Sequence, residues 1–276
     1  MIKISIQGSR GSFHDIVARK RFPDDSEIVE SDTYHQVFED IKKGFVDYGV
    51  VAIENSIYGS FRENYDLLLK YDAKIVGEIY HKIVLDLIAL PGVKLKDLKE
   101  VYTHPMAMTQ AEAFLGKYPD LKRIETNDTA SSARMIKEGG LCHAAAIGSE
   151  LAAEIYGMNV LAHDIETERN NYTRFLFLAK EEHYPDDADK TSIVIRGKDE
   201  PGSLYRCLKT FVDQKINLSK LESRQLVGSF DSYFYLDFEK GLYKDETQRA
   251  LIELRKETKM IKILGTYKKG SIKDIK

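Results

Sequence analysis

The 276-residue sequence predicts an α/β unit followed by a smaller α+β unit of about 80 residues. Up to residue 180, short apolar runs alternate with helical patterns, which is typical of parallel α/β units. From residue 190 to 276, the order is strand, helix, strand, strand, helix, strand, as in a ferredoxin-like sandwich. Between the two units, the acidic segment 181–189 contains Pro185 and is typical of a linker.

The elements of the first unit follow from the spacing of its apolar residues. We expect strands at Ile2–Gln7, Tyr48–Ile53, Lys74–Glu78, Ile83–Leu90, Glu100–Thr103, Ala144–Ile147 and Phe175–Ala179. We expect helices at His14–Arg21, Thr33–Lys43, Asn64–Lys70, Met106–Lys117, Thr129–Gly139 and Glu150–Tyr156. The run Ala144–Ile147 is apolar throughout, as a strand buried on both faces should be.

In the second unit, alternation predicts four strands, at Thr191–Arg196, Leu218–Arg224, Ser232–Phe238 and Met260–Tyr267. Pro201-Gly202-Ser203 begins a helix that we expect to reach about residue 215. A second helix is expected at Glu246–Glu257, and a turn around Gly228.

The composition excludes several classes of protein. Hydrophobic residues make up 43% of the chain, an ordinary globular fraction that excludes a disordered or collagen-like chain. No apolar run approaches the roughly 18 residues of a membrane span, and the N-terminus lacks a signal-peptide core, so we expect no membrane partner. Cys142 and Cys207 form no CxxC pair, so we expect no zinc site or disulfide and predict a cytoplasmic location.

The charge distribution and the motifs of the sequence exclude further classes of function. The net charge is −3, with basic residues in excess after residue 190 and acidic residues in excess before it. No aromatic and arginine platform accompanies the basic end, so we expect no nucleic-acid partner. The sequence has no HExxH, GxSxG, Walker A or complete GxGxxG pattern, so we expect no metal and no cofactor.

Small polar residues follow several of the predicted strands. They lie at 8–12, 54–60, 103–105, 126–129 and 148–150. Each segment alone is explained as a helix cap. Because ligands of parallel sheets bind beyond the carboxyl ends of the strands, and helix N-termini attract anions, the segments together predict a site for a carboxylate or phosphate.

A Thr-Arg pair precedes the last strand of the first unit. Arg174 offers a planar fork for a carboxylate, and Thr173 offers a hydroxyl that can donate a proton or hydrogen bond. Neighbouring side chains of a strand point to opposite faces, so both reach one ligand only at an irregular strand entry. A β-branched strand start beside a surface arginine explains the pair equally well.

Five ordered motifs extend across nearly the whole chain. The segment 52–68, with AIENS and NYDLL, and Thr103-His104-Pro105 with Gln110 resemble the PIEN[ST], DLL and SHP…Q motifs of the prephenate dehydratase family. Ala145–Ser149 with Ala152–Gly157 resembles AAI[AG]S…AAxxYGL, and Asn171-Tyr172-Thr173-Arg174-Phe175 matches NxTRF. Pro201–Leu204 and Ile216–Arg224 resemble the GAL and INLTKIESRP motifs of the family's regulatory ACT domain.

The resemblance implies a two-lobed α/β catalytic domain, similar to type II periplasmic binding proteins, followed by an α+β ferredoxin-like ACT domain. It implies conversion of prephenate to phenylpyruvate, water and carbon dioxide in L-phenylalanine biosynthesis, with feedback by L-phenylalanine. It also implies a homodimer or homotetramer assembled through ACT domains, with the effector near Pro201–Leu204 of one copy and Leu221–Arg224 of the other.

Taken together, the motifs give a set of candidate residues. We expect Thr173, Arg174 and Asn55 to be catalytic. Residues expected to bind substrate are Ser12, Glu54, Ser56, Gly59, Ser60, Thr103, His104, Thr129, Ala130, Asn171 and Phe175. Residues expected to bind the effector are Pro201, Gly202, Ser203, Leu204, Leu221, Glu222, Ser223 and Arg224.

Two alternative functions remain open at this stage. One is an arogenate dehydratase, with the same chemistry on the aminated substrate, and the other is a non-catalytic amino-acid sensor. Five positions depart from the family's usual residues: Ser9 replaces a Pro, His14 a Ser or Thr, Met106 a Gln, Ser203 an Ala and Gln225 a Pro.

Overall fold

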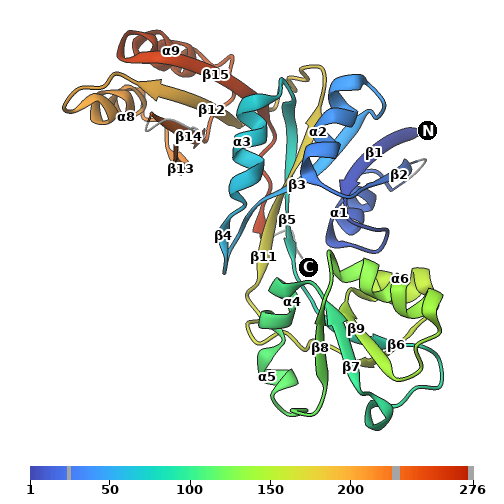
Figure 1. The fold of residues 1–276 in the computed structure, drawn as a ribbon. Coiled ribbons are helices and arrows are strands. Elements are labelled where there is room, and N and C mark those ends of the chain that lie inside the picture. The colour runs from blue at the N-terminus through green and yellow to red at the C-terminus, as the bar shows by residue number, and fades with distance from the viewer. Residues whose placement is uncertain (24–25, 226–230, 273–276) are drawn as a thin grey trace.

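The computed structural model describes residues 1–23, 26–225 and 231–272, in which the strands form three sheets. Two sheets belong to two lobes of the α/β part, and the third belongs to a C-terminal unit, residues 190–272 (Figure 1). The order of helices and strands in that unit is the predicted βαββαβ order.

The first lobe is built on a mixed sheet with the strand order β2-β1-β3-β11-β5, and β4 pairs with β3. Its strands are β1 (Ile2–Gln7), β2 (Ser26–Ser31), β3 (Tyr48–Asn55), β4 (Gly59–Ser60), β5 (Lys74–Lys82) and β11 (Tyr172–Ala179). Its helices are α1 (Phe13–Arg21), α2 (Tyr34–Lys43) and α3 (Arg62–Lys70). Strands β1, β2 and β3 are parallel, whereas β11 runs antiparallel to both of its neighbours.

The second lobe has the strand order β10-β6-β9-β7-β8. Its strands are β6 (Asp86–Ala89), β7 (Glu100–Thr103), β8 (Lys122–Glu125), β9 (Ala144–Gly148) and β10 (Asn159–Ala162). Its helices are α4 (Pro105–Gln110), α5 (Glu112–Leu115), α6 (Thr129–Gly139) and α7 (Glu150–Tyr156), with a 3-10 turn at Leu95–Asp97. Strand β9 is fully buried, as its unbroken apolar run predicted.

The chain crosses between the lobes twice, after β5 and again before β11, which pair side by side in the first lobe. The loop before α1 also contacts the second lobe, because the Ser149 hydroxyl donates to the carbonyl of Gly11 over 2.5 Å. Gly11 has a φ of +86°, and a Cβ there would come within 2.7 Å of the Ala152 backbone, so only glycine fits. The two lobes are therefore also in direct contact, at the loop before α1.

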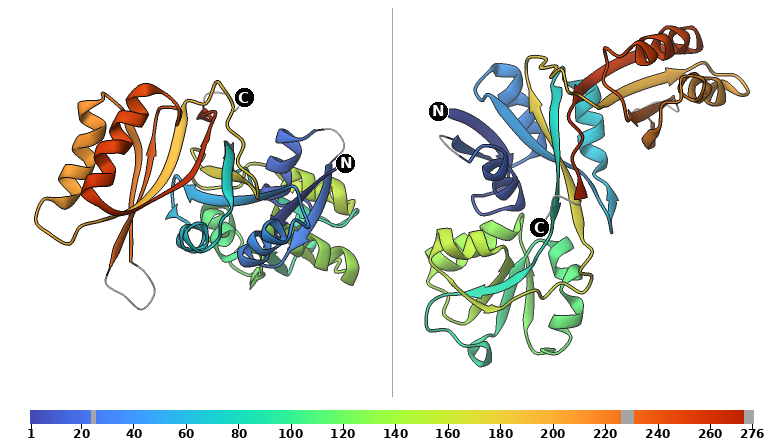
Figure 2. Two further views of the ribbon diagram at one scale, coloured as in Figure 1. Left: turned by 90° about the horizontal axis from the view of Figure 1, so that it is seen from above. Right: turned by 180° about the vertical axis from the view of Figure 1, so that it is seen from behind.

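The C-terminal unit has the antiparallel strand order β13-β14-β12-β15. Its strands are β12 (Lys190–Gly197), β13 (Leu218–Gln225), β14 (Ser232–Phe238) and β15 (Thr258–Tyr267), and its helices are α8 (Ser203–Asp213) and α9 (Asp245–Glu257). Figure 2 shows both helices on the side of this sheet turned away from the lobes.

Strand β12 shows why the C-terminal sheet is buried on both faces. Ile193 and Ile195 pack with residues of α8 and α9, whereas Val194 packs in the core of the first lobe. Because successive side chains of a strand point to opposite faces, one apolar run joins the two cores. The C-terminal unit thus lies directly against the first lobe.

Several predicted elements differ from those observed. The sheets of both lobes are mixed rather than parallel. In the first lobe the two crossings bring β11 back antiparallel, and in the second lobe β6 pairs antiparallel with β9 and β10. The predicted helix 106–117 is divided into α4 and α5, and Ile83–Leu85 connects the lobes instead of beginning β6. The edge strands β2, β8 and β10 were not predicted. The predicted turn at Gly228 lies outside the described residues.

Candidate active site

A crevice of about 470 Å³ lies between the two lobes. The first lobe lines it with residues of the loops after β1 and β2, of β3, of the start of α3 and of β11, and the second lobe does so with the loops after β7 and β8. The lining residues are Gln7, Ser12, Phe13, His14, Asp32, Thr33, Tyr34, Ala52, Asn55, Phe61, Glu63, Ile83, His104, Met106, Ala107, Gln110, Asn127, Asp128, Thr129, Thr173 and Phe175.

Helix N-termini surround this crevice. Helices α1, α2 and α6 begin there, and their N-cap residues Ser12, Thr33 and Asp128 all line it. Each cap side chain accepts a backbone N–H of its own helix. The shorter helix α4 begins there too, capped by His104. Since helix N-termini carry a partial positive charge, the crevice favours an anionic ligand.

The charged side chains of the crevice do not themselves attract an anion. Among the described residues, no lysine or arginine lines it, and its charged groups are the carboxylates of Asp32, Glu63 and Asp128. The Asp128 carboxylate is occupied in capping α6. Attraction for an anion must therefore come from peptide N–H groups and helix dipoles.

The buried hydroxyl of Thr173 lies at the crevice, next to Asn55 of the neighbouring strand β3. Asn55 Nδ2 donates to Thr173 Oγ1 over 2.9 Å and to Asn171 Oδ1 over 2.8 Å. Asn55 Oδ1 accepts the backbone N–H groups of residues 57 and 58, which fixes the orientation of the amide.

This arrangement determines where the Thr173 proton points. A hydroxyl has one donor and two acceptor sites, and Asn55 already donates to one of the acceptor sites. No acceptor for the Thr173 proton occurs among the residues that the structure describes. The hydroxyl is thus free to donate a hydrogen bond to a ligand in the crevice.

One wall of the crevice is aromatic. Phe175 and the buried His14 meet edge to face, with ring centroids 5.0 Å apart, and Tyr34 also packs against His14, with ring centroids 5.7 Å apart. Burial lowers the pKa of His14 to about 3 and raises that of Tyr34, so both rings are neutral at ordinary pH. This wall suits the flat face of a six-membered ring.

His104 is also held neutral. Burial lowers its pKa, and the opposing effects of Asp128 and Glu125 are smaller. Its Nδ1 accepts the backbone N–H of Met106 over 3.2 Å, so the proton of the neutral ring is on Nε2. Met106 and Gln110, two positions of the predicted SHP…Q motif, both line the crevice.

Arg174, which we predicted to be catalytic, does not line the crevice. Strand β11 keeps its alternation here, so Thr173 and Phe175 face the crevice and Arg174 faces the opposite side. There its guanidinium contacts Glu54, Glu78 and Asp237. Glu54 is turned away in the same manner, because its neighbour Asn55 faces the crevice.

Comparisons with known proteins agree with this geometry. A family model described as prephenate dehydratase matches residues 4–183.

The chain belongs to the prephenate dehydratase family.

Members of this family are lyases, so the protein is an enzyme and not the non-catalytic sensor that we considered.

One relative is arogenate dehydratase/prephenate dehydratase 2 of Arabidopsis thaliana, a chloroplastic protein, which is 38% identical over 96% of this chain and 72% of its own length. The crystal structure of prephenate dehydratase from Arthrobacter aurescens in complex with L-Phe has a TM-score of 0.88 and 28% identity, covering 97% of this chain and 90% of that one. GqqA, described as a novel type of quorum quenching acylase, has the same TM-score and 30% identity over 98% of both chains. Proteins with this fold therefore carry both names.

Six of the predicted catalytic and substrate-binding residues line the crevice of this family member. They are Ser12, Asn55, His104, Thr129, Thr173 and Phe175. The remaining ones, apart from Arg174 and Glu54, lie behind or beside the crevice: Ser56, Gly59, Ser60, Thr103, Ala130 and Asn171. Thr103, for example, is buried and donates to the carbonyl of Ile147, and Asn171 accepts the Asn55 amide.

The sequence did not single out several crevice residues as site residues. Gln7, Thr33 and Tyr34 line the crevice beside the predicted set. Thr33 was missed because β2, whose end brings it to the crevice, is a polar edge strand without an apolar run. A signal was present, since Ser31-Asp32-Thr33 precedes a predicted helix as the other cap segments do.

The predicted effector residues separate into two groups. Pro201, Ser203 and Leu204 line a surface depression at the start of α8, with Gly202 at the N-cap. On β13, Leu221 and Ser223 are exposed. Glu222 and Arg224 instead face the first lobe of their own chain, where Ser60 donates to Glu222 and Arg224 donates to Asp66.

Neither a metal-binding cluster nor a membrane-spanning helix occurs in the described residues. In residues 1–23, 26–225 and 231–272, no cluster of three or more His, Cys, Asp or Glu side chains is arranged to hold a metal ion. Within the same ranges, every helix is too short or too polar to span a bilayer.

Proposed function

We propose that the protein converts prephenate to phenylpyruvate, water and carbon dioxide in L-phenylalanine biosynthesis. The observation that carries this proposal is the Thr173 hydroxyl, which accepts from Asn55 and is free to donate into a crevice surrounded by helix N-termini. Prephenate has two carboxylates, a ring and a departing hydroxyl, and the crevice offers a complementary group for each.

The formation of an aromatic ring in the product supplies the thermodynamic driving force of the reaction. The bond between the ring and its carboxylate breaks, and carbon dioxide leaves. The electron pair of that bond moves into the ring, and the bond from the opposite ring carbon to its hydroxyl breaks. The hydroxide takes one proton and leaves as water. The overall change therefore consumes one proton per prephenate.

Thr173 donates its hydrogen bond to the departing hydroxyl and so polarises that bond. A threonine hydroxyl is a poor general acid, so its main contribution is to orient the leaving group and stabilise the charge that develops there. Asn55 keeps the Thr173 oxygen lone pair occupied, which directs the Thr173 proton toward the ligand. The neutral wall of His14 and Phe175 holds the ring.

The two carboxylates would bind at the N-termini of α1, α2 and α6. Peptide N–H groups and helix dipoles are fixed before the substrate arrives, so they need no reorganisation during the reaction. Ser12 and Thr129 stand at two of these helix starts.

Arogenate is the second candidate substrate. It carries an ammonium group where prephenate carries a keto group. Asp32 and Glu63 line the crevice, are exposed, and form no ion pair with any described residue, so they favour a substrate with a positive charge.

One assay tests the proposal and separates the two substrates. Purified protein is incubated with prephenate or arogenate, and phenylpyruvate is followed by absorbance and phenylalanine by chromatography. The proposal predicts turnover of prephenate, and faster turnover of arogenate decides for the second candidate. Failure to convert either substrate contradicts the proposed function.

We also propose that the C-terminal unit is an ACT domain that binds L-phenylalanine and pairs with a second copy in a homodimer or homotetramer. The phenylalanine in the Arthrobacter aurescens structure supports this, as does the buried Ser203 hydroxyl, which has no hydrogen-bond partner among the described residues. Calorimetry at millimolar phenylalanine tests binding, and ultracentrifugation tests assembly. No heat of binding, or a monomer, contradicts the respective claim.

A further inference from the structure

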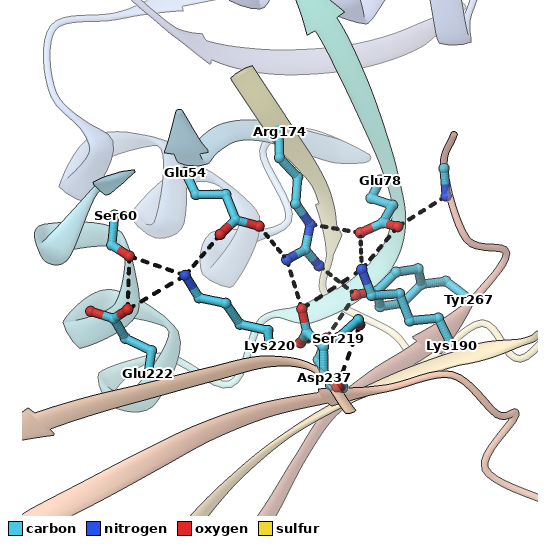
Figure 3. Close-up of polar contacts among 12 residues, drawn as sticks. Glu54, Ser60, Glu78, Arg174, Lys190, Ser219, Lys220, Glu222, Asp237 and Tyr267 are labelled. Atoms are coloured by element: carbon cyan, nitrogen blue, oxygen red, sulfur yellow. Dashed lines mark hydrogen bonds and ion pairs between the residues drawn. The ribbon is translucent and has the colours of Figure 1, made fainter. Parts of the chain in front are cut away.

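A buried cluster of charged side chains joins the first lobe to the C-terminal unit (Figure 3). Three neighbouring strands of the lobe contribute to it: Glu54 of β3, Arg174 of β11 and Glu78 of β5. The C-terminal sheet contributes Lys190, Lys220, Asp237 and Tyr267, one from each of its four strands.

Arg174 is the centre of this cluster. Its Nε donates to Glu78 over 2.7 Å, and its Nη1 contacts Glu54 at 3.0 Å and Asp237 at 2.6 Å. Its Nη2 donates to the Tyr267 hydroxyl over 3.1 Å. All three nitrogens of the guanidinium are thus engaged, two of them with the C-terminal unit. Lysine, which has one nitrogen, cannot make these contacts together.

The cluster is balanced in charge and closed to solvent at its centre. The side chains of Arg174, Lys190 and Glu78 are at most 3% exposed. Lys190 contacts both Glu78, at 2.9 Å, and Asp237, at 3.7 Å, so two cations face two carboxylates. Burial opposes ionisation of Asp237, but Arg174 and Lys190 outweigh it and hold its pKa below the ordinary value. Asp237 therefore remains charged and keeps its ion pair with Arg174.

The cluster is one residue away from the crevice on two adjacent strands. Arg174 follows Thr173 on β11, and Glu54 precedes Asn55 on β3. Thr173 is paired with Asn55 across these strands, and Arg174 with Glu54. The Glu54–Arg174 ion pair on one face thus lies directly behind the Asn55–Thr173 hydrogen bond on the other. Between Arg174 and Phe175 the pairing with β3 shifts register, and it continues from Phe175, which pairs with Ala52.

We propose that Arg174 is a positioning residue for the reaction: by fixing the outer face of β11 to the C-terminal sheet, it sets the position of the Thr173 hydroxyl on the inner face. Asp237 and Lys190 of the C-terminal unit contribute to the same positioning of Thr173. This proposal rests on the role proposed above for Thr173.

The principal test is the kinetics of Arg174→Lys, with a matched control. The substitution keeps the charge and loses the planar fork. We expect kcat to fall by about 10- to 100-fold, since small displacements of a reacting group have effects of this size, while KM changes by less than about threefold. The control is Lys262→Met. Lys262 also joins the C-terminal unit to the first lobe, donating to the carbonyls of Leu68, Leu69 and Tyr71, but it does not contact β11. Its loss should lower the melting temperature and leave kcat within about twofold.

A double-mutant cycle distinguishes positioning from a merely structural role. If Arg174 acts through Thr173, then Arg174→Lys changes kcat by less than about twofold in the Thr173→Ala background. If it only stabilises the fold, its effect is the same in both backgrounds. Should Thr173→Ala be too slow to measure, a crystal structure of Arg174→Lys decides: we predict loss of the 2.9 Å bond between Asn55 and Thr173.

Three results would overturn the proposal: an unchanged kcat in Arg174→Lys, an equal loss in Lys262→Met, or an intact Asn55–Thr173 bond in the Arg174→Lys structure. If Arg174→Lys does not fold, Asp237→Asn takes its place, and it should lower kcat although Asp237 lies in the C-terminal unit. A parent protein that turns over neither substrate refutes the proposed function instead, and the crystal structure still tests the geometry.

Discussion

The two faces of β11 use opposite kinds of electrostatics. Toward the crevice, Thr173 and Phe175 meet neutral side chains and the starts of helices, with no cation among the described lining residues. Toward the C-terminal unit, Arg174 meets three carboxylates, and two lysines complete the cluster. The side that is proposed to bind a dianion thus lacks cations, whereas the side without a ligand is dense with charge.

The difference follows from what each face must do. A ligand that enters and leaves is best held by groups that stay fixed when it is gone, and peptide dipoles fulfil this without collapsing onto neighbouring carboxylates. A permanent interface can bury full charges because each has its partner at all times. In a net-acidic protein, cations placed in an open crevice would pair with its own acids.

The largest expected effect comes from removing the donor on the crevice face. Thr173→Ala should lower kcat by about 10²- to 10⁴-fold, the usual contribution of a positioned proton or hydrogen-bond donor. Thr173→Ser, which retains the hydroxyl, should stay within about tenfold of the parent. Steady-state turnover of prephenate measures both. If Thr173→Ala also remains within about tenfold, equivalent to about 1.4 kcal/mol in barrier, Thr173 does not have this role.

A smaller effect is expected from reversing the hydrogen bond to Thr173. Asn55→Asp has nearly the same shape, but its carboxylate accepts and cannot donate. The Thr173 proton would then turn toward residue 55 and away from the substrate. We expect kcat to fall by about 10- to 100-fold with the fold intact. A variant with parental kcat would show that the direction of this bond does not matter.

The smallest effect concerns the neutral aromatic wall. Burial lowers the pKa of His14 to about 3, below the 6.5 of an unfolded histidine, so the unfolded chain binds this proton first as the pH falls. The stabilisation from neutral His14 is complete above pH 6.5 and is lost as the pH falls toward about 3. Between pH 7.5 and pH 5.5, the free energy of unfolding should fall by about 1.4 kcal/mol more in the parent than in His14→Gln. Urea unfolding at the two pH values measures this, and equal losses in both proteins would contradict it.

Local rules predicted much of the fold and part of the site. Ser12 and the segment 126–129 were identified because capping residues are a property of neighbouring positions. Strand alternation indicated from the sequence that Thr173 and Arg174 face opposite sides of β11. The residues that each of them contacts are determined by tertiary packing. The partners of Arg174 come from β3, β5, β14 and β15, up to 120 residues away in sequence, and no pattern within β11 predicts them.

Two of the strands that were missed share one physical cause. Strands β2 and β8 lie at sheet edges and carry polar side chains, so their sequences lack the apolar run of a central strand. Missing β2 also removed Thr33 and Tyr34 from the candidate residues. The mixed direction of the first sheet depends on two crossings between lobes, which local periodicity does not encode.

A crystal structure of Thr173→Ala with prephenate bound tests the central claim most directly, because the substrate should persist in this variant. The account predicts both carboxylates at the N-termini of α1, α2 or α6, and the ring hydroxyl within about 3 Å of the position that the Thr173 oxygen occupies in the parent. A substrate bound with its carboxylates on lysine or arginine side chains, or with its hydroxyl turned away from residue 173, would contradict it.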